Sequence, residues 1–194
     1  MQRALIVIDV QESFRQRPNW AATSDPQIAD QVDRLVVHAR AKGDLVVWVL
    51  HSEAGSGNVF DPARGFVRYI EGLKPEAGEP ELVKTSHNAF TTTNLHQILT
   101  SHGVREVAVC GIRTEQCCET TARVASDLGF TVDFVIDATA THPIPHRDSD
   151  YERPIEEILA DPLTLQTADV TARTEYALAG RFATISTVDE VTAR

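Results

Sequence analysis

The stretch that decides the fold is residues 107–118, which read VAVCGIRTEQCC. Its first four residues, 107–110, form a short unbroken apolar run of the kind found in buried strands. Gly111 then allows a tight turn, and residues from about 115 to 128 have the apolar spacing of a helix that ends at Gly129. A strand, a tight turn and a helix in this order predict one unit of a parallel α/β sheet.

The same alternation of strand and helix occurs along the rest of the chain. The other apolar runs rich in β-branched residues are 4–8, 45–50, 132–136 and 182–185, and residues 81–84 are compatible with a further short strand. Another predicted helix has its apolar stripe at 28–39, with Asp25 as cap, Pro26 at its first position and Gly43 at its end, and two more are predicted at about 93–102 and 168–179. This predicts a Rossmann-like three-layer α/β fold with a mostly parallel sheet of about six strands, helices on both faces, and one domain over residues 1–194.

Charge and cysteine content exclude several classes of protein. The 194 residues include 28 Asp plus Glu against 18 Lys plus Arg, a net charge of −10 that repels nucleic acid and anionic lipid. No apolar run approaches the roughly 20 residues that span a bilayer, and the N-terminus has no signal-peptide pattern. Three cysteines, two of them adjacent, do not form a disulfide framework. We therefore predict a cytoplasmic protein with free thiols that binds a small molecule, not nucleic acid or a membrane.

Three chemically active side chains lie where ligands bind in such a sheet, beyond the carboxyl ends of the strands. Asp9 follows the first apolar run, Lys84 ends the short run at 81–84, and Cys117 lies in or near the first turn of its helix. Backbone N–H groups and the helix dipole there lower a thiol pKa and can bind an oxyanion. Each residue also has a structural alternative: a cap or turn former for Asp9, a solvated charge for Lys84, and a small buried hydrophobe for Cys117 or Cys118. The strand-turn-helix placement favours a nucleophile for Cys117 only.

Other ligand sites have little support in the sequence. No glycine follows the first apolar run, so a phosphate-binding loop is not predicted. The histidines lack the spacing of a zinc site, and we predict neither a metal nor a cofactor. His51 is interpreted as a pocket wall or polar anchor, and His142 and His146 as parts of a mobile loop.

Four separated pieces of the chain carry a resemblance to a known family. They are DVQ at 9–11 with Phe14, Lys84 with AF at 89–90 and TNL at 93–95, GIRTEQC at 111–117 with TAR at 121–123, and RFA at 181–183 with STVDE at 186–190. In this order, and over nearly the whole chain, they resemble the isochorismatase-like cysteine hydrolase family.

The resemblance implies a catalytic triad and a homo-oligomer. Cys117 would be the nucleophile, Asp9 the acid/base and Lys84 the cation between them. A cis peptide at Ile112–Arg113 would turn the Arg113 N–H towards the substrate, so that it forms an oxyanion hole with the Cys117 N–H. Candidate substrate-binding residues are Phe14, Trp20, His51 and Arg113.

Departures from the family pattern refine the expected chemistry. Arg113 replaces a small residue, so its side chain either binds an anionic substrate or partly fills the pocket, or is an ordinary surface arginine. Cys118 replaces a valine, which we interpret as a packing change. The metal-binding nicotinamidase branch has an Asp-x-His pair where this chain has His51-Ser52-Glu53, which supports a metal-free site.

Two functions compete with amide hydrolysis. The favoured activity is cleavage of an amide, carbamoyl or imide C–N bond through a thioester. Within the enzyme class, the alternative is hydrolysis of a vinyl ether of the isochorismate type, which commonly proceeds without the cysteine. Outside it, the alternative is a non-catalytic binding protein in which Cys117 senses oxidants.

Overall fold

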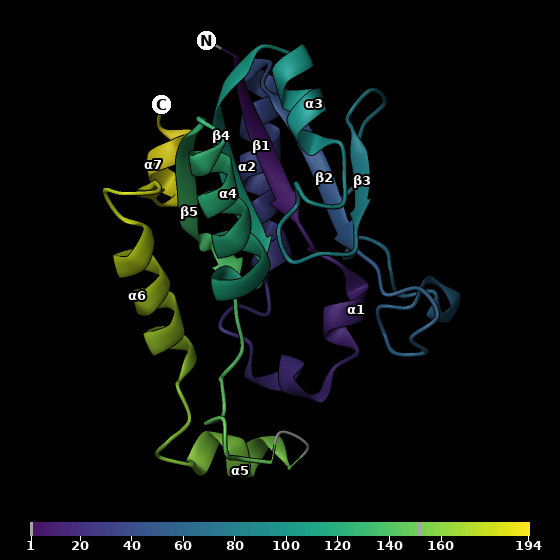
Figure 1. The fold of residues 1–194 in the computed structure, drawn as a ribbon, viewed down its shortest axis with the longest axis vertical. Helices are drawn as coiled ribbons and strands as arrows, with labels where there is room; N and C mark the ends of the chain where they lie inside the picture. The colour runs from purple at the N-terminus through teal and green to yellow at the C-terminus, as the bar shows by residue number, and fades with distance from the viewer. Residues whose placement is uncertain (1, 151–152) are drawn as a thin grey trace.

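The computed structural model describes residues 2–150 and 153–194, which form a six-stranded parallel sheet with helices on both faces (Figure 1). The strands are β1 Gln2–Ile8, β2 Leu45–His51, β3 Glu81–Lys84, β4 Val104–Ile112, β5 Thr131–Ala140 and β6 Thr184–Ser186. Their order is β3-β2-β1-β4-β5-β6, and each neighbouring pair is parallel. The predicted fold class is therefore confirmed.

The helices include the four expected ones and several short additions. They are α1 Glu12–Arg15, α2 Ile28–Lys42, α3 Leu95–Ser101, α4 Glu119–Asp127, α5 Ile155–Ala160, α6 Thr167–Leu178 and α7 Val188–Thr192, with 3-10 turns η1 Pro18–Ala22 and η2 Pro62–Arg64 and a π-helical turn η3 Thr114–Cys118. The helix predicted at 115–128 is η3 continued by α4. The helices α1, α5 and α7 were not predicted because four to six residues are too few for a helical period to show.

The predicted cap of α2 is wrong by two residues. The helix begins at Ile28, and Asp25 accepts a hydrogen bond from the Gln27 N–H at 2.8 Å in the turn before it. At the other end, Gly43 has a φ of 72° and ends the helix as predicted.

Burial on both faces of the sheet explains why the strands show no alternation of apolar and polar residues. In β1, Leu5 and Val7 pack in the cluster that includes α2 and α7. Ala4 and Ile6 belong to the cluster on the opposite face, with α3, α4 and α6. A strand covered on both faces must be apolar at every position.

The order of the strands creates a crevice at one end of the sheet. The chain runs outward from β1 in one direction and from β4 in the other, and these two strands are neighbours. Beyond their carboxyl ends lie α1, η1 and α5, at the bottom of Figure 1. Ligands of open α/β sheets bind at such a point.

Gly111 is required where β1 and β4 approach each other, since a Cβ at this position would lie 1.9 Å from the Ile8 carbonyl oxygen. Its φ of 127° also disfavours any side chain. We expect Gly111→Ala to lower the free energy of unfolding by about 3 kcal/mol and the Tm by about 10 °C in a thermal melt. Gly129→Ala is the control, because Gly129 has a φ of 91° but no atom within 4 Å of the added Cβ. Equal losses in the two variants would show that the contact with Ile8 is unimportant.

Among the described residues, no helix combines the length and the apolar character needed to cross a membrane.

Candidate active site

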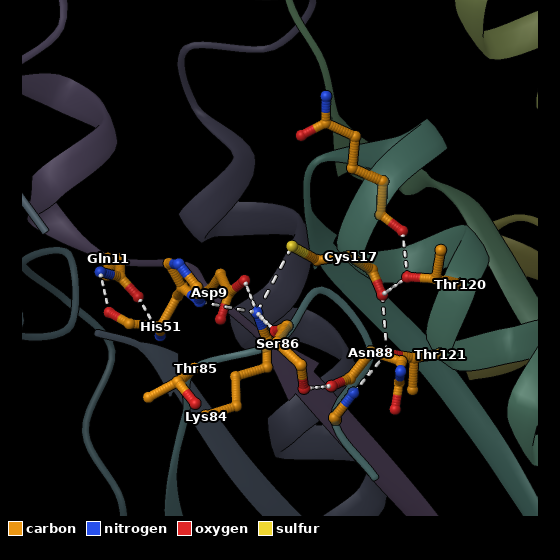
Figure 2. A network of polar contacts seen from close by, with 12 residues as sticks. Asp9, Gln11, His51, Lys84, Thr85, Ser86, Asn88, Cys117, Thr120 and Thr121 are labelled. Carbon is orange, nitrogen blue, oxygen red and sulfur yellow. Dashed lines mark hydrogen bonds and ion pairs between the residues drawn. The ribbon is translucent and has the colours of Figure 1, made fainter. Parts of the chain in front are cut away.

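The carboxyl ends of neighbouring strands bring together side chains that are distant in the sequence (Figure 2). Asp9 directly follows β1, and its N–H donates to the Val49 carbonyl oxygen of β2 at 2.8 Å. His51 and Lys84 end β2 and β3 and are paired in register. Cys117 lies in η3, which follows β4 after a turn at Arg113; the tight turn predicted at Gly111 is wrong, because β4 continues through Gly111 to Ile112. The parallel direction of the strands thus places all four residues at one edge of the sheet.

Lys84 occupies the centre of this cluster. Its Nζ lies 2.7 Å from Asp9 Oδ2 and 3.4 Å from Cys117 Sγ, and it donates to the Ser86 carbonyl oxygen at 3.1 Å. The side chains of Lys84 and Asp9 are both 0% exposed, and Cys117 is 7% exposed. A buried charge of either sign is costly alone, so the close pair makes both tolerable. The structure therefore brings together the three residues that the resemblance placed in a triad.

Asp9 has an unusual backbone conformation. Its φ of 53° is the one positive value at a non-glycine position in the described parts of the chain. Few residues other than Gly, Asn and Asp adopt this region, and such residues concentrate at functional sites. The Gln11 N–H donates to the Asp9 carbonyl oxygen at 2.8 Å, which closes a tight turn directly after β1.

Burial and charge act in opposite directions on the two ions. Burial raises the pKa of the Asp9 carboxyl above its usual value, although Lys84 and Cys117 act to lower it. Burial alone would lower the pKa of Lys84, but the Asp9 carboxylate and Cys117 outweigh it and raise this pKa. Lys84 therefore stays protonated at neutral pH, and Asp9 is a stronger base than an exposed aspartate.

The thiol of Cys117 departs from the sequence-based expectation. Burial, followed by the charge of Asp9, raises the pKa of the Cys117 thiol to about 12, and Lys84 only partly offsets this. The prediction of a lowered pKa considered the start of the helix but not the buried carboxylate beside the sulfur. A resting thiol of this kind must lose its proton to a base as it reacts.

Removing the charge of Asp9 and removing the charge of Lys84 should have opposite effects on the alkylation of Cys117. Since Asp9 raises and Lys84 lowers the thiol pKa, Asp9→Asn should move the rise of the alkylation rate to lower pH. Lys84→Met should move it to higher pH. Below these pKa values the thiolate fraction grows as the pKa falls, so the rate of iodoacetamide modification at about pH 9, measured by peptide mass mapping, should be higher in Asp9→Asn and lower in Lys84→Met than in the unaltered protein. Shifts in the same direction for both variants would contradict the proposed electrostatics.

His51 connects the cluster to a second acid. Its Nδ1 lies 3.4 Å from Lys84 Nζ and its Nε2 lies 3.1 Å from Glu53 Oε1. An imidazole that donates from Nε2 to Glu53 accepts at Nδ1 from Lys84, so these partners select one tautomer. His51 therefore contacts the catalytic candidates through Lys84, consistent with the predicted polar anchor.

Gln11 is a buried residue to which the sequence analysis gave no role of its own. Its side chain accepts from the His51 N–H at 2.7 Å and donates to the His51 carbonyl oxygen at 3.1 Å. The side-chain amide of Gln11 therefore pairs with both backbone groups of His51, as the backbone of an adjacent strand does in a sheet, and so links the segment after β1 to the end of β2. The two hydrogen bonds fix the backbone of His51 to Gln11, which lies two residues after Asp9.

Arg113 forms the turn between β4 and η3. The Ile112–Arg113 peptide is cis, as the resemblance implied. The Arg113 carbonyl oxygen accepts from the Cys118 N–H at 3.1 Å, a bond that belongs to the π-helical turn. Its side chain is 11% exposed and pairs with Glu115 at 2.8 Å. Arg113 is therefore not an ordinary surface arginine.

The expected aromatic residues surround a histidine that was misassigned. The rings of Phe14 and Trp20 lie 6.3 and 6.0 Å from the ring of His142. His142 is fully buried, not part of a mobile loop as predicted. The misassignment arose because β5 extends to Ala140, four residues beyond the expected end, so His142 closely follows a strand. The position of His142, two residues after a strand, was the feature of the sequence that could have indicated a buried residue near the site.

A cavity of about 560 Å³ lies between η1, the start of η3 and α5, and Asp9, Lys84 and Cys117 are not among its lining residues. It is lined by Arg113 and by Gln116, the residue before Cys117. Of the four predicted substrate-binding residues, Arg113 alone lines it; Phe14, Trp20 and His51 do not. The part of the chain that the structure describes contains no group of three or more His, Cys, Asp or Glu arranged to hold a metal ion.

Known proteins resemble this chain over most of its length. The family model "Isochorismatase domain" matches residues 3–166. A streptothricin hydrolase of Streptomyces noursei is 37% identical over 147 residues, which cover 74% of this chain and 51% of that protein. The ureidoacrylate amidohydrolase RutB of Klebsiella pneumoniae is 25% identical over 177 residues, 73% of each protein. The crystal structure of an isochorismatase from Pseudomonas putida has a TM-score of 0.82 and 28% identity, covering 97% of this chain and 89% of that one.

Proposed function

This chain belongs to the isochorismatase family of hydrolases, and we propose that it cleaves a C–N bond of a small molecule through a thioester on Cys117. The observation that carries the proposal is the position of Lys84 Nζ, 2.7 Å from Asp9 Oδ2 and 3.4 Å from Cys117 Sγ. A buried base, cation and thiol in direct contact match the needs of an activated cysteine nucleophile. The name of the relative RutB, an amidohydrolase, supports an amide as the bond cleaved.

The first half-reaction forms the acyl-enzyme. Cys117 Sγ attacks the carbonyl carbon while its proton moves to the Asp9 carboxylate, whose raised pKa suits this role. A C–S bond forms and the carbonyl π electrons move to oxygen. When the tetrahedral intermediate collapses, the C–N bond breaks and the nitrogen leaves with the proton held by Asp9. Lys84 keeps its proton throughout and balances the negative charge on Asp9 and sulfur.

The second half-reaction restores the thiol. Water attacks the thioester carbon as Asp9 accepts one of its protons. The C–S bond then breaks, the acid product leaves, and Asp9 returns the proton to sulfur. In both halves we assign the oxyanion to the backbone N–H groups of Arg113 and Cys117. N–H groups at the start of a helical segment have no acceptor within it, which supports this assignment.

The test is to detect the acyl-enzyme. The intact protein is incubated with a panel of small amides, carbamoyl compounds and imides, quenched in acid and measured by mass spectrometry. We expect an added mass equal to the acyl group, located on the peptide containing Cys117, with release of ammonia or an amine. Turnover without any adduct, at a rate that is unchanged in Cys117→Ala, would instead favour hydrolysis of a vinyl ether.

A further inference from the structure

The cavity between η1, η3 and α5, which Gln116 lines just before Cys117 in the chain, has charged side chains of one sign only. Its charged lining residues are Arg17, Arg113 and Arg153, with no acidic residue among those described. In a chain with 28 acidic and 18 basic residues, three arginines and no acid at one cavity is a marked departure from the overall balance. The remaining wall is mostly apolar and comes from residues 143–145 and from Ile155 and Ile158. Such a site combines an apolar surface with a few charged groups, as ligand sites do.

The three arginines differ in how their charge is balanced. Arg113 pairs with Glu115 at 2.8 Å and Arg153 pairs with Asp161 at 2.5 Å. The Arg17 guanidinium has no hydrogen bond or ion pair with any residue in 2–150 or 153–194. Among the described residues, two of the three arginines are thus paired with a carboxylate, whereas Arg17 acts on Glu53 only as a nearby charge that lowers the pKa of that carboxyl.

Polar atoms at the wall also lack partners. Nε of Arg113, Nε of Arg153 and Oδ1 of Asn19 are buried without a hydrogen bond in the described structure, and all three residues line the cavity. An unpaired buried donor is costly and is commonly satisfied by a ligand or by water. Both Nε–H groups are donors, so they require an acceptor.

The positive charge of the arginines also affects the protonation of a neighbouring residue, His142. Burial, together with the charges of Arg113 and Arg17, lowers the pKa of His142 to about 3. His142 is therefore a neutral ring that contributes aromatic surface next to Phe14 and Trp20.

We propose that this cavity holds the non-reacting end of the substrate and selects amides that carry a carboxylate, bound by Arg17 with help from Arg113 and Arg153. Arg113 links the two sites, because its side chain lines the cavity and its backbone leads into the turn that contains Cys117. This inference rests on the proposed function, since it names the substrate class of the same site.

Two alkylating reagents of nearly equal size test the inference. Iodoacetate carries a carboxylate and iodoacetamide its neutral amide, so the ratio of their rates at Cys117, followed by peptide mass mapping, reports the preference for the anion. We expect Arg17→Gln to lower the ratio of the iodoacetate rate to the iodoacetamide rate at least about tenfold. Arg15→Gln, which removes the same charge two residues away from an exposed position outside the cavity, should leave the ratio unchanged.

The outcomes separate the two proposals. If iodoacetamide modifies Cys117 but the ratio is the same in Arg17→Gln and Arg15→Gln, the carboxylate site is refuted and the nucleophile stands. If no compound of the amide panel forms an acyl-enzyme on Cys117 of the unaltered protein, the proposed function fails, and the substrate class that rests on it fails as well.

Discussion

Cys117→Ala abolishes turnover: we expect kcat to fall at least about ten-thousand-fold on any amide that yields an acyl-enzyme. No other thiol can replace it, because Cys110 and Cys118 are fully buried, and burial raises the pKa of Cys118 well above its usual value. The fold should persist, since the change removes one sulfur atom from the edge of a core and costs about 1 kcal/mol. Steady-state kinetics and a thermal melt of the purified variant measure both effects.

The neighbouring residue provides the control. Cys118→Ala makes the same chemical change in a residue that is fully buried in the core shared by α3, α4 and α6. It should lose a similar amount of stability and keep kcat within a few-fold. Equal losses of activity in the two variants would mean that damage to packing, and not loss of a nucleophile, explains the effect. Full activity in Cys117→Ala would reject the thioester mechanism.

Lys84→Met leaves the Asp9 carboxylate buried without a cation. We expect a loss of 3–5 kcal/mol in the free energy of unfolding, a fall in Tm of about 10 °C, and loss of turnover. Burial already raises the pKa of Asp9, and loss of Lys84 would raise it further. At lower pH the Asp9 carboxylate is therefore protonated, and the variant regains part of the lost free energy of unfolding. The stability gap to the unaltered protein should therefore be smaller at pH 5 than at pH 7, as urea titrations at the two pH values would measure.

A double variant distinguishes this electrostatic cause from lost packing. In Lys84→Met with Asp9→Asn the unpaired charge is gone, so the double variant should be more stable than Lys84→Met alone, although still inactive. Lys42→Met removes a charge from an exposed position and should change stability by less than about 0.5 kcal/mol. If the two single losses simply add in the double variant, the pair is not coupled and its assignment as a buried ion pair is wrong.

The layers of the fold could be predicted because their signals are local. A strand that is buried on both faces must be apolar throughout, and this is visible in five or six consecutive residues. The start of α2 was misplaced because Asp25 satisfies the N–H of Gln27 in a separate turn, which has the same residue preferences as a cap. The extension of β5 to Ala140 was missed because polar residues interrupt its apolar run, and His142 was misassigned as a result.

The direction in which the pKa of the Cys117 thiol is shifted could not be predicted from the sequence, for a different reason. The start of a helix lowers the pKa of a cysteine, and the sequence indicates that position correctly. Burial and the neighbouring Asp9 carboxylate act in the opposite direction and are stronger. Neither could be evaluated from residues adjacent to Cys117, because Asp9 lies 108 positions earlier in the chain.

The amino-acid sequence by itself determined the parallel sheet and the identity of the side chains that end the strands, because each depends on neighbours along the chain. Only the tertiary structure decided that Lys84 lies between Asp9 and Cys117, and that three arginines from separate segments line one cavity. The physical reason is that the order and register of strands set these distances, and burial then sets how strongly the charges interact. Both are properties of the packed sheet as a whole.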